Sequence, residues 1–421
     1  MRPLLSIIIA TKNRIPYCIN VIETILKFDN SDFELVIQDN SDTLDLKIFI
    51  QDNISDKRLI YNYIAPPFSS IANFNAALES ANGDYVCLIG DDDGINPEIF
   101  KVVQWASLNN INAIVPELNA VYWWPDTCSI LKKCTEGHGI LEISKISGNV
   151  SQFQTNNEVV TLMKNGGQGY LNHNLPKLYH GVVKKEVLDK IKKITGYYIG
   201  GLSPDIYISV ALTFFINKII KIDYPLTIPG ICSLSTSADS ATGKHTGKLE
   251  NAPHFIDRGQ YNWSEKVPKI YCVEAIWADS VIASLTDMER LTLLSKFNIT
   301  TLTILLLKSH KTYYQVILKN YIDNKSSNPL TKVYYFISIL INYFGYTFVN
   351  ILFRAVRKTK RIITRLISNS KFESNNLTGL NNVDNISQAT DELAQYLSNR
   401  SFSIDIIIKK LDILLDKTVR N

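Results

Sequence analysis

A short apolar segment that ends in three consecutive aspartates constrains this sequence more than any other feature. Residues 85–89 (Tyr-Val-Cys-Leu-Ile) carry no polar alternation, which is typical of a strand buried on both faces of a sheet. A glycine follows, and aspartates then stand side by side at positions 91–93. Adjacent carboxylates at the end of a buried strand repel one another, so they favour a divalent cation with oxygen ligands, Mg²⁺ or Mn²⁺. The alternative is a solvated acidic turn before a helix that Pro97 opens.

The residues before this segment alternate between apolar strands and amphipathic helices. Runs that favour strands lie at 4–10, 34–38 and 59–63, and apolar residues at helical spacing lie at 15–28, 44–53 and 71–78. This alternation predicts an α/β fold whose sheet is mostly parallel, with helices on both faces. Ligands bind beyond the carboxyl ends of such strands, so we expect Asp39 and the aspartate triplet at one edge of the sheet.

Three motifs in this region resemble those of the family 2 glycosyltransferases of the bacterial surface-polysaccharide type, which have a GT-A fold. They are Ser6-Ile-Ile-Ile-Ala-Thr-Lys-Asn-Arg14, Val36-Ile-Gln-Asp-Asn-Ser41 and Gly83-Asp-Tyr-Val-Cys-Leu-Ile-Gly-Asp-Asp-Asp93. The resemblance covers residues 4–105 closely and extends more loosely to 250. It implies transfer of a sugar from a nucleotide donor, with inversion at the anomeric carbon and with help from Mn²⁺ or Mg²⁺. A UDP-sugar is the expected donor.

The same resemblance implies roles for individual residues. Thr11 and Arg14 are expected beside the nucleotide, and Asp39 is expected to accept a hydrogen bond from the base. Asp91 is expected to contact the donor, while Asp92, ranked first, and Asp93 are expected to hold the metal. The sequence departs from the family's usual Leu-Asp-x-Asp-Asp, because a glycine at position 90 stands where the first aspartate of that motif stands.

Asp205 is the candidate general base. It lies at the first turn of an apolar segment that favours a helix, where a carboxylate is also stabilised by the helix dipole. The resemblance places an acidic residue before the helix on the acceptor side, and an inverting transfer needs a carboxylate to take the proton of the acceptor hydroxyl. We therefore prefer the base over the helix-start role.

A segment rich in glycine, serine and threonine follows, and it predicts a mobile loop over the donor. Its Lys244 and Lys248 have the chemistry to bind a diphosphate, and His245 is a candidate metal ligand. The alternative for a single loop histidine is a solvated side chain. The glycines of 166–169 predict a second flexible loop, over the acceptor.

Two further groups have competing interpretations. The aromatic run 122–124 favours either a platform for sugar stacking or core packing. Cys128, Cys134 and His138 have spacings that fit no common zinc site, and a fourth ligand is not evident.

The sequence predicts a catalytic domain at 1–250. After it we expect a helical region at 251–367, a linker at 368–387 and an amphipathic helical tail at 388–421. Residues 333–353 carry no charge, and six basic residues follow within 354–365. This pattern favours peripheral contact with an anionic membrane, with a membrane span and a buried core helix as alternatives. The tail is expected either to dock back onto the chain or to form a homo-oligomer.

Composition and charge argue against some classes of protein. The net charge of +4 does not argue for nucleic acid, and the scattered cysteines favour a reducing compartment over a disulfide framework. The apolar N-terminus favours a first strand over a signal peptide, so we expect a cytoplasmic enzyme at the inner face of the cell membrane. The predicted function is a metal-dependent inverting glycosyltransferase that acts on a saccharide or lipid-linked acceptor in surface polysaccharide or glycolipid synthesis. The alternatives are a sugar nucleotidyltransferase and a catalytically silent membrane scaffold.

Overall fold

The computed structural model describes residues 2–131, 137–235, 246–367, 377–400 and 403–419. Its centre is a parallel sheet made by the four strands that the sequence predicts, namely β1 (Leu5–Thr11), β2 (Phe33–Asp39), β3 (Leu59–Tyr63) and β4 (Tyr85–Ile89), in the order β3-β2-β1-β4. Every residue of β2 and β4 is buried, as runs without alternation require.

Four more strands extend this sheet beyond β4 to eight. They are β10 (Val182–Lys184), β6 (Ala113–Pro116), β11 (Lys218–Ile222) and β9 (Val150–Gln154). β10 runs antiparallel to both of its neighbours, and β6 and β11 are parallel to each other. The sequence did not identify β9 and β11 as strands.

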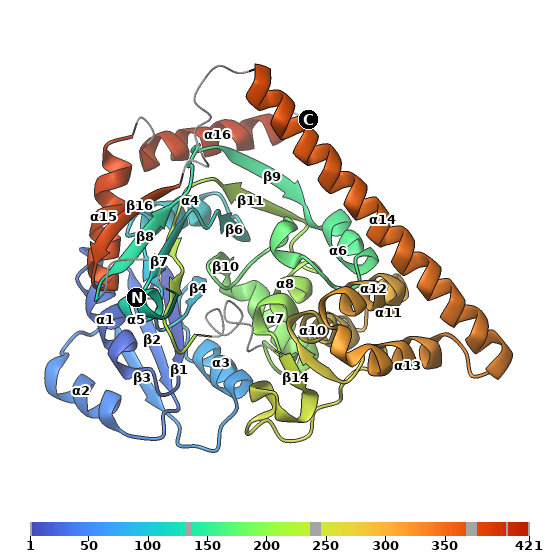
Figure 1. Ribbon diagram of the computed structural model, residues 1–421. Helices are drawn as coiled ribbons and strands as arrows, with labels where there is room; N and C mark the ends of the chain where they lie inside the picture. Colours follow the sequence, from blue (N-terminus) through green and yellow to red (C-terminus); the bar gives the residue numbers. More distant parts are fainter. Residues whose placement is uncertain (1, 132–136, 236–245, 368–376, 401–402, 420–421) are drawn as a thin grey trace.

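Helices cover both faces of the sheet (Figure 1). One face packs against α1 (Ile15–Leu26), α2 (Asp45–Asn53) and α4 (Ile99–Leu108), and the other against α3 (Ser70–Glu79), α7 (Lys185–Thr195) and α8 (Pro204–Leu212). Two separate apolar cores result, one on each side of the sheet. The predicted α/β fold is confirmed.

Short strands build a second layer at the carboxyl end of β4. β5 (Gly94–Ile95) pairs with β12 (Thr227–Ile228), and a four-stranded sheet runs in the order β13 (Gly230–Ile231), β7 (Ala120–Trp123), β8 (Gly139–Ile143) and β16 (Thr378–Val383). α5 (Pro125–Leu131) follows β7. These strands bring residues 228–232 against the aspartate triplet.

The aromatic run belongs to this layer. Tyr122 and Trp124 are buried and pack against each other, with ring centroids 5.1 Å apart. For Tyr122 and Trp124, the core-packing interpretation of this run is therefore the correct one. Cys128 is in a disulfide, so the expectation of unpaired cysteines holds for Cys18, Cys87, Cys232 and Cys272 and not for Cys128. Cys134 lies outside the described residues.

A helical unit follows the catalytic sheet. It contains α10 (Val273–Asp287), α11 (Leu291–Leu294), α12 (Ile299–Ser309), α13 (Tyr314–Lys325) and the 39-residue α14 (Pro329–Ile367), and α6 (Thr155–Lys164) packs against it. A hairpin of β14 (Thr246–Lys248) and β15 (Ile270–Cys272) leads into α10. Among the described residues, no helix combines the length and apolar character needed to cross a membrane.

The glycines at 166–169 do not form the flexible loop that the sequence predicts. Gly166 and Gly167 are buried and have φ of +66° and +75°. A Cβ on Gly166 would lie 2.9 Å from Leu302, and one on Gly167 would lie 3.1 Å from the backbone of Ala278. The glycines instead allow close packing of this segment on α10 and α12.

The C-terminal segment returns to the catalytic sheet. β16, which falls inside the predicted linker, pairs with β8, while residues 368–376 of that linker lie outside the described residues. α15 (Ile386–Ser398) and α16 (Ile404–Val419) bury Leu393, Ile407 and Leu411 in the same core as α1 and α4 (Figure 1). The tail therefore docks back onto the chain, which is one of the two alternatives that the sequence left open.

Candidate active site

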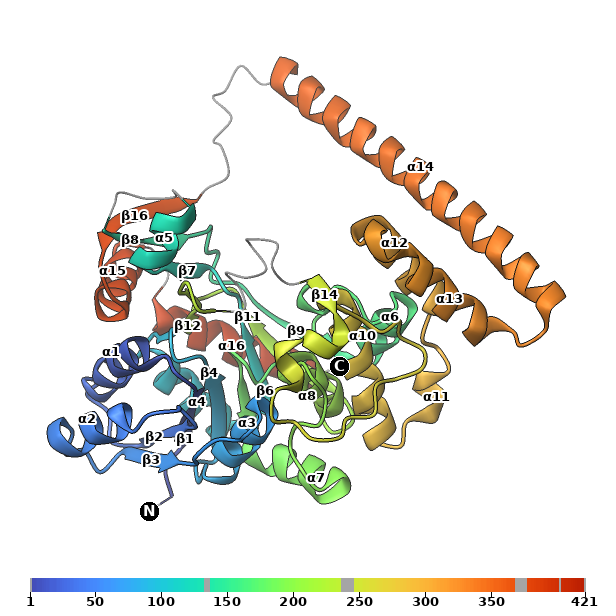
Figure 2. The same ribbon diagram turned by 60° about the horizontal axis from the view of Figure 1, so that its bottom comes forward.

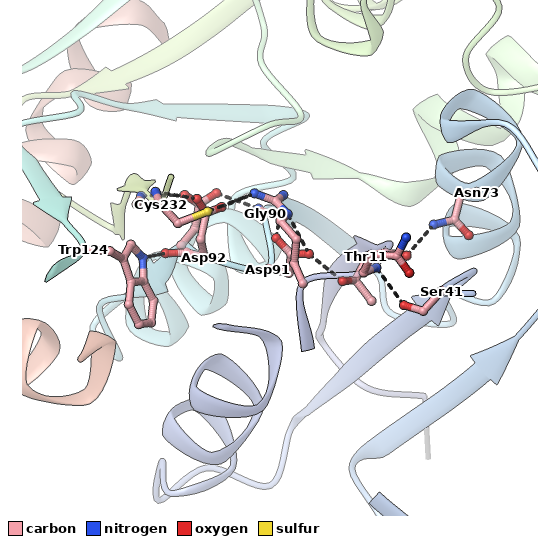
Figure 3. A network of polar contacts seen from close by, with 12 residues as sticks. Thr11, Ser41, Asn73, Gly90, Asp91, Asp92, Trp124 and Cys232 are labelled. Atoms are coloured by element: carbon pink, nitrogen blue, oxygen red, sulfur yellow. Dashed lines mark hydrogen bonds and ion pairs between the residues drawn. The ribbon is translucent and has the colours of Figure 1, made fainter. Parts of the chain in front are cut away.

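Asp91 joins the first and third motifs at the carboxyl edge of the sheet. It accepts a hydrogen bond from the Thr11 hydroxyl over 2.5 Å, and Arg14 Nη2 lies 2.5 Å from its Oδ1 (Figure 3). Arg14 follows a turn in which Asn13 has a φ of +59°, and the turn is tied down because Ser41 Oγ accepts from the Asn13 amide. Three residues predicted beside the nucleotide thus meet in one buried cluster.

The Asp92 carboxylate makes fewer hydrogen bonds than that of Asp93. Asp92 Oδ2 accepts one hydrogen bond, from the Cys232 amide over 3.2 Å, and its Oδ1 lies 3.5 Å from Arg14 Nη1. Its backbone carbonyl accepts from Trp124 Nε1 over 2.9 Å, which fixes the main chain (Figure 3). The Asp92 carboxylate therefore retains lone pairs for another ligand.

Asp93 is held on both oxygens. Its Oδ1 accepts from the Gly230 amide over 2.6 Å, and its Oδ2 accepts from the Gly90 amide over 2.6 Å and from the Tyr179 hydroxyl over 3.0 Å. His180 Nε2 lies 3.4 Å from the same oxygen. Through these contacts, Asp93 connects the end of β4 to β13 and to the segment before β10.

The glycine at position 90 has a structural reason. A Cβ there would lie 2.7 Å from the Tyr179 hydroxyl and 2.9 Å from a carboxylate oxygen of each of Asp92 and Asp93. No L side chain fits this space without displacing them. The departure from the family motif is thus matched by Tyr179, which stands where the side chain of residue 90 would begin.

The aspartate triplet carries more negative charge than its protein surroundings balance. All three side chains are buried, and Arg14 is the cation that contacts them among the described residues. Burial, together with the neighbouring carboxylates, raises the pKa of Asp91 to about 7 and that of Asp92 to about 6, although Arg14 opposes both shifts. An oxygen-rich site with excess negative charge fits a hard divalent cation.

Asp39 lies beside this cluster, since it is paired with Thr11 across β1 and β2. Its Oδ1 accepts from the Ser41 amide over 2.8 Å, and its Oδ2 accepts from the Tyr61 hydroxyl over 2.8 Å. Asn73 of α3 donates to the carbonyls of Thr11 and Gln38, which holds the ends of the two strands together (Figure 3).

Asp205 occupies the first turn of α8, as the sequence predicts. Its Oδ2 lies 3.5 Å from the Tyr170 hydroxyl, which donates to it. Burial raises the pKa of Asp205 to about 6, and the charge on Asp93 adds to the rise while Lys177 opposes it. The charges of Asp205 and Asp93 therefore influence each other.

The predicted donor loop is only partly described. Lys244 and His245 lie outside the described residues. Lys248 is exposed on β14, and the carboxylate nearest to its Nζ in the described part of the chain is Glu250, at 3.9 Å. The structure thus does not bring Lys248 into contact with the aspartate cluster.

Several residues of the site escaped the sequence reasoning. Tyr179, His180 and Cys232 come from segments that lack a family motif, and each reaches the triplet from a distant position in the chain. Trp124 belongs to the aromatic run that the sequence singled out, but its hydrogen bond to the Asp92 carbonyl was not predicted. The dipeptide Tyr179-His180 directly before a glycine and an apolar run was the one signal available.

A second group of potential metal ligands lies in the helical unit. Cys272, Glu274 and His310 have ligand atoms within 4.8 Å of one another, and His310 Nε2 lies 2.9 Å from Glu274 Oε2. This group joins the start of α10 to the end of α12, and no residue of the triplet belongs to it.

Residues 6–128, which include Thr11, Arg14 and the aspartate triplet, match the model of the family described as Glycosyl transferase family 2. Among solved structures, the chain is similar to Staphylococcus aureus TarS 1-349 in complex with UDP-GlcNAc, with 14% identity, coverage of 76% of this chain and 80% of that chain, and a TM-score of 0.45. It is also similar to S. aureus TarS 1-349, with 15% identity, coverage of 76% and 89%, and a TM-score of 0.40. No curated protein matches the sequence. With the acidic strand end at the edge of a parallel α/β sheet, the match of residues 6–128 to the model of glycosyl transferase family 2 identifies this chain as a glycosyltransferase.

Proposed function

We propose that this chain transfers a sugar from a nucleoside diphosphate to an acceptor hydroxyl, with inversion at the anomeric carbon. Two buried groups with different chemistry support the proposal. The buried aspartate triplet has the charge to hold a metal-bound diphosphate, and Asp205 has a pKa raised to about 6, suited to general-base catalysis near neutral pH.

Thr11, Arg14, Asp39 and Asp91 form the donor side in this proposal. Arg14 bridges Asp91 and Asp92, so its guanidinium lies between the expected nucleotide and the expected metal. Asp39 is aligned with Thr11 on the neighbouring strand, which suits contact with a base stacked over the edge of the sheet. A UDP-sugar is the donor to test first.

Asp92 is the proposed metal ligand, because its carboxylate keeps unused lone pairs. Asp93, the second candidate, has both oxygens in hydrogen bonds, which supports a role in positioning Asp92 instead of direct ligation. Mn²⁺ or Mg²⁺ held there would supply positive charge to stabilise the leaving diphosphate. Lys244, Lys248 and His245 remain proposed contacts of a donor-covering loop.

Asp205 is the proposed base. The acceptor oxygen attacks the anomeric carbon while the bond from that carbon to the diphosphate oxygen breaks, and the hydroxyl proton passes to the Asp205 carboxylate. A single displacement of this kind inverts the configuration. Tyr170, at 3.5 Å, holds the carboxylate in place.

The proposed context is synthesis of a surface polysaccharide or glycolipid on the cytoplasmic side of the cell membrane, with a saccharide or lipid-linked acceptor. The proposed catalytic unit comprises residues 4–231 together with 378–419, because β16, α15 and α16 complete its core. The helical unit at 270–367 packs beside it.

The decisive experiment incubates the full chain with a panel of nucleotide-sugars and Mn²⁺ and measures release of nucleoside diphosphate. We expect hydrolysis of one donor, dependent on the metal, and transfer once an acceptor is supplied. Proton NMR of the product then gives the anomeric configuration. Retained configuration, or the absence of donor turnover and donor binding across the panel, would contradict the proposal.

A further inference from the structure

We propose that α14 holds the protein on an anionic lipid surface, lying flat on the bilayer with one apolar face in the headgroup region. This inference goes beyond sugar transfer and does not depend on the identity of the donor. It rests on the exposure of α14, on its packing and on the charge of the segment around it.

One face of α14 is bound to the protein. Ile339 is fully buried, and Tyr335, Tyr343 and Tyr346 pack against the core of the helical unit with it. Figure 2 shows α14 along the outside of the molecule with α12 and α13 on one side of it. The packed face fixes which side of the helix remains available.

The opposite face is apolar and exposed. Its members recur at spacings of three and four residues, which places them on one stripe of the helix. They are Val333, Ile337, Ile341, Phe344 and Phe348. Ile341 and Phe344 are each 66% exposed, which is unusual for side chains of this size arranged on one stripe.

Charge decides between possible occupants of this face. Residues 270–367, which form the helical unit, contain 13 basic and five acidic residues, a net charge of +8, whereas the whole chain carries +4. The remaining residues therefore carry −4. A second copy of the helical unit would bring like charges together, whereas anionic headgroups neutralise them.

The arrangement along the helix also fits a lipid surface. The described apolar stripe lies within residues 333–353, which hold no charged residue, and α14 then continues through 354–365, where the sequence has six basic residues and no acidic one. Basic residues beside an apolar stripe are typical of interfacial helices, whereas an RNA surface would leave the apolar stripe uncovered.

The test uses sedimentation of the full chain with vesicles of phosphatidylcholine mixed with phosphatidylglycerol. The variant Ile341→Asp/Phe344→Asp changes exposed side chains only. The control variant Ile48→Asp/Leu108→Asp carries the same changes at exposed positions, 51% and 82%, on the catalytic unit. Donor hydrolysis and thermal unfolding are measured on each preparation, so loss of activity and loss of lipid binding are separable.

We expect the wild-type chain and the control to sediment with the mixed vesicles, and the α14 variant to lose at least about tenfold in binding. Binding should fall when salt rises from about 0.1 M to about 0.5 M, and it should be weak on phosphatidylcholine alone. If the α14 variant is unstable, Ile337→Ser/Phe348→Ser replaces it. Equal binding by both variants would overturn the proposal. So would an oligomer in solution that only the α14 variant dissociates, or binding of RNA without binding of vesicles.

Discussion

The Tyr179 hydroxyl donates a hydrogen bond to Asp93 Oδ2 over 3.0 Å, although 86 residues separate the two in the chain. The same hydroxyl lies 2.7 Å from the position that a Cβ on Gly90 would take. Tyr179 and Gly90 therefore form a matched pair, in which the missing side chain makes room for the tyrosine.

This pairing predicts non-additive stabilities. Gly90→Ala should destabilise the fold by about 1–3 kcal/mol, the usual cost of overpacking, because the new methyl group contacts Tyr179 and two carboxylates. Tyr179→Phe alone should cost about 0.5–1.5 kcal/mol through the lost hydrogen bond. The double variant should cost less than the sum, measured by denaturant unfolding. Gly379→Ala, where a Cβ has nothing within 4 Å, is the control, and strict additivity would contradict the pairing.

Asp92→Asn should abolish metal-dependent binding of the donor. A neutral amide cannot balance the cation, and the Asp92 carboxylate makes fewer hydrogen bonds to the protein than that of Asp93. Calorimetry with a nucleoside diphosphate, with and without Mn²⁺, measures the effect. Asp84→Asn, at the exposed start of the same strand, should bind like the wild type. Unchanged metal dependence in Asp92→Asn would move the metal site elsewhere.

Asp205→Asn should reduce transfer by about 10² to 10⁴ and leave donor affinity nearly unchanged, because it removes positioned proton transfer and little else. The pKa of Asp205 is raised to about 6, and only the ionised form accepts a proton. The wild-type transfer rate should therefore rise with pH between about 5 and 7 and then level off. Residual activity of Asp205→Asn should lack this rise, and an identical pH profile would show that another group titrates. Asp52→Asn on the surface of α2 serves as the control.

Removal of metal should lower the unfolding temperature more at neutral pH than at acidic pH. Burial raises the pKa values of Asp91 and Asp92 to about 7 and about 6, above those of the unfolded chain. The stability that their protonated forms contribute is present at acidic pH and is lost as pH rises through these values. Mn²⁺ should therefore raise the unfolding temperature more at about pH 7.5 than at about pH 5, relative to EDTA, because protons compete with the cation. Scanning calorimetry checks this, and an equal shift at both pH values would contradict it.

Leu393→Ala should destabilise the catalytic unit by about 2–5 kcal/mol, the usual cost of truncating a buried leucine. Leu393 lies on α15, far along the chain from the sheet whose core it completes. Ile413→Ala on α16, with a 55% exposed side chain, should cost much less. Denaturant unfolding with donor hydrolysis as a second probe should show that the two properties are lost together in Leu393→Ala. If Leu393→Ala keeps both its stability and its donor hydrolysis, the tail is dispensable for this core.

The sequence by itself determined the parallel α/β sheet, since apolar strands and amphipathic helices are local patterns with periods that can be read directly. It also determined which side chains gather at the strand ends, because parallel strands bring Thr11, Asp39 and the 91–93 aspartates to one edge whatever the rest of the chain does. The position of Asp205 at a helix start was also predictable, because the apolar segment after it favours a helix.

Only the tertiary structure decided how these side chains are held. Tyr179, Gly230 and Cys232 reach the triplet across 86 to 140 residues, and no local period encodes such contacts. The glycines of 166–169 looked flexible by composition, but close packing against α10 and α12 requires them. The sequence left open whether the tail docks back or forms a homo-oligomer, because its amphipathic pattern gives a buried face and not its partner. The partner proved to be the catalytic core, since the exposed apolar surface beside α1 and α4 had to be covered by some part of the chain.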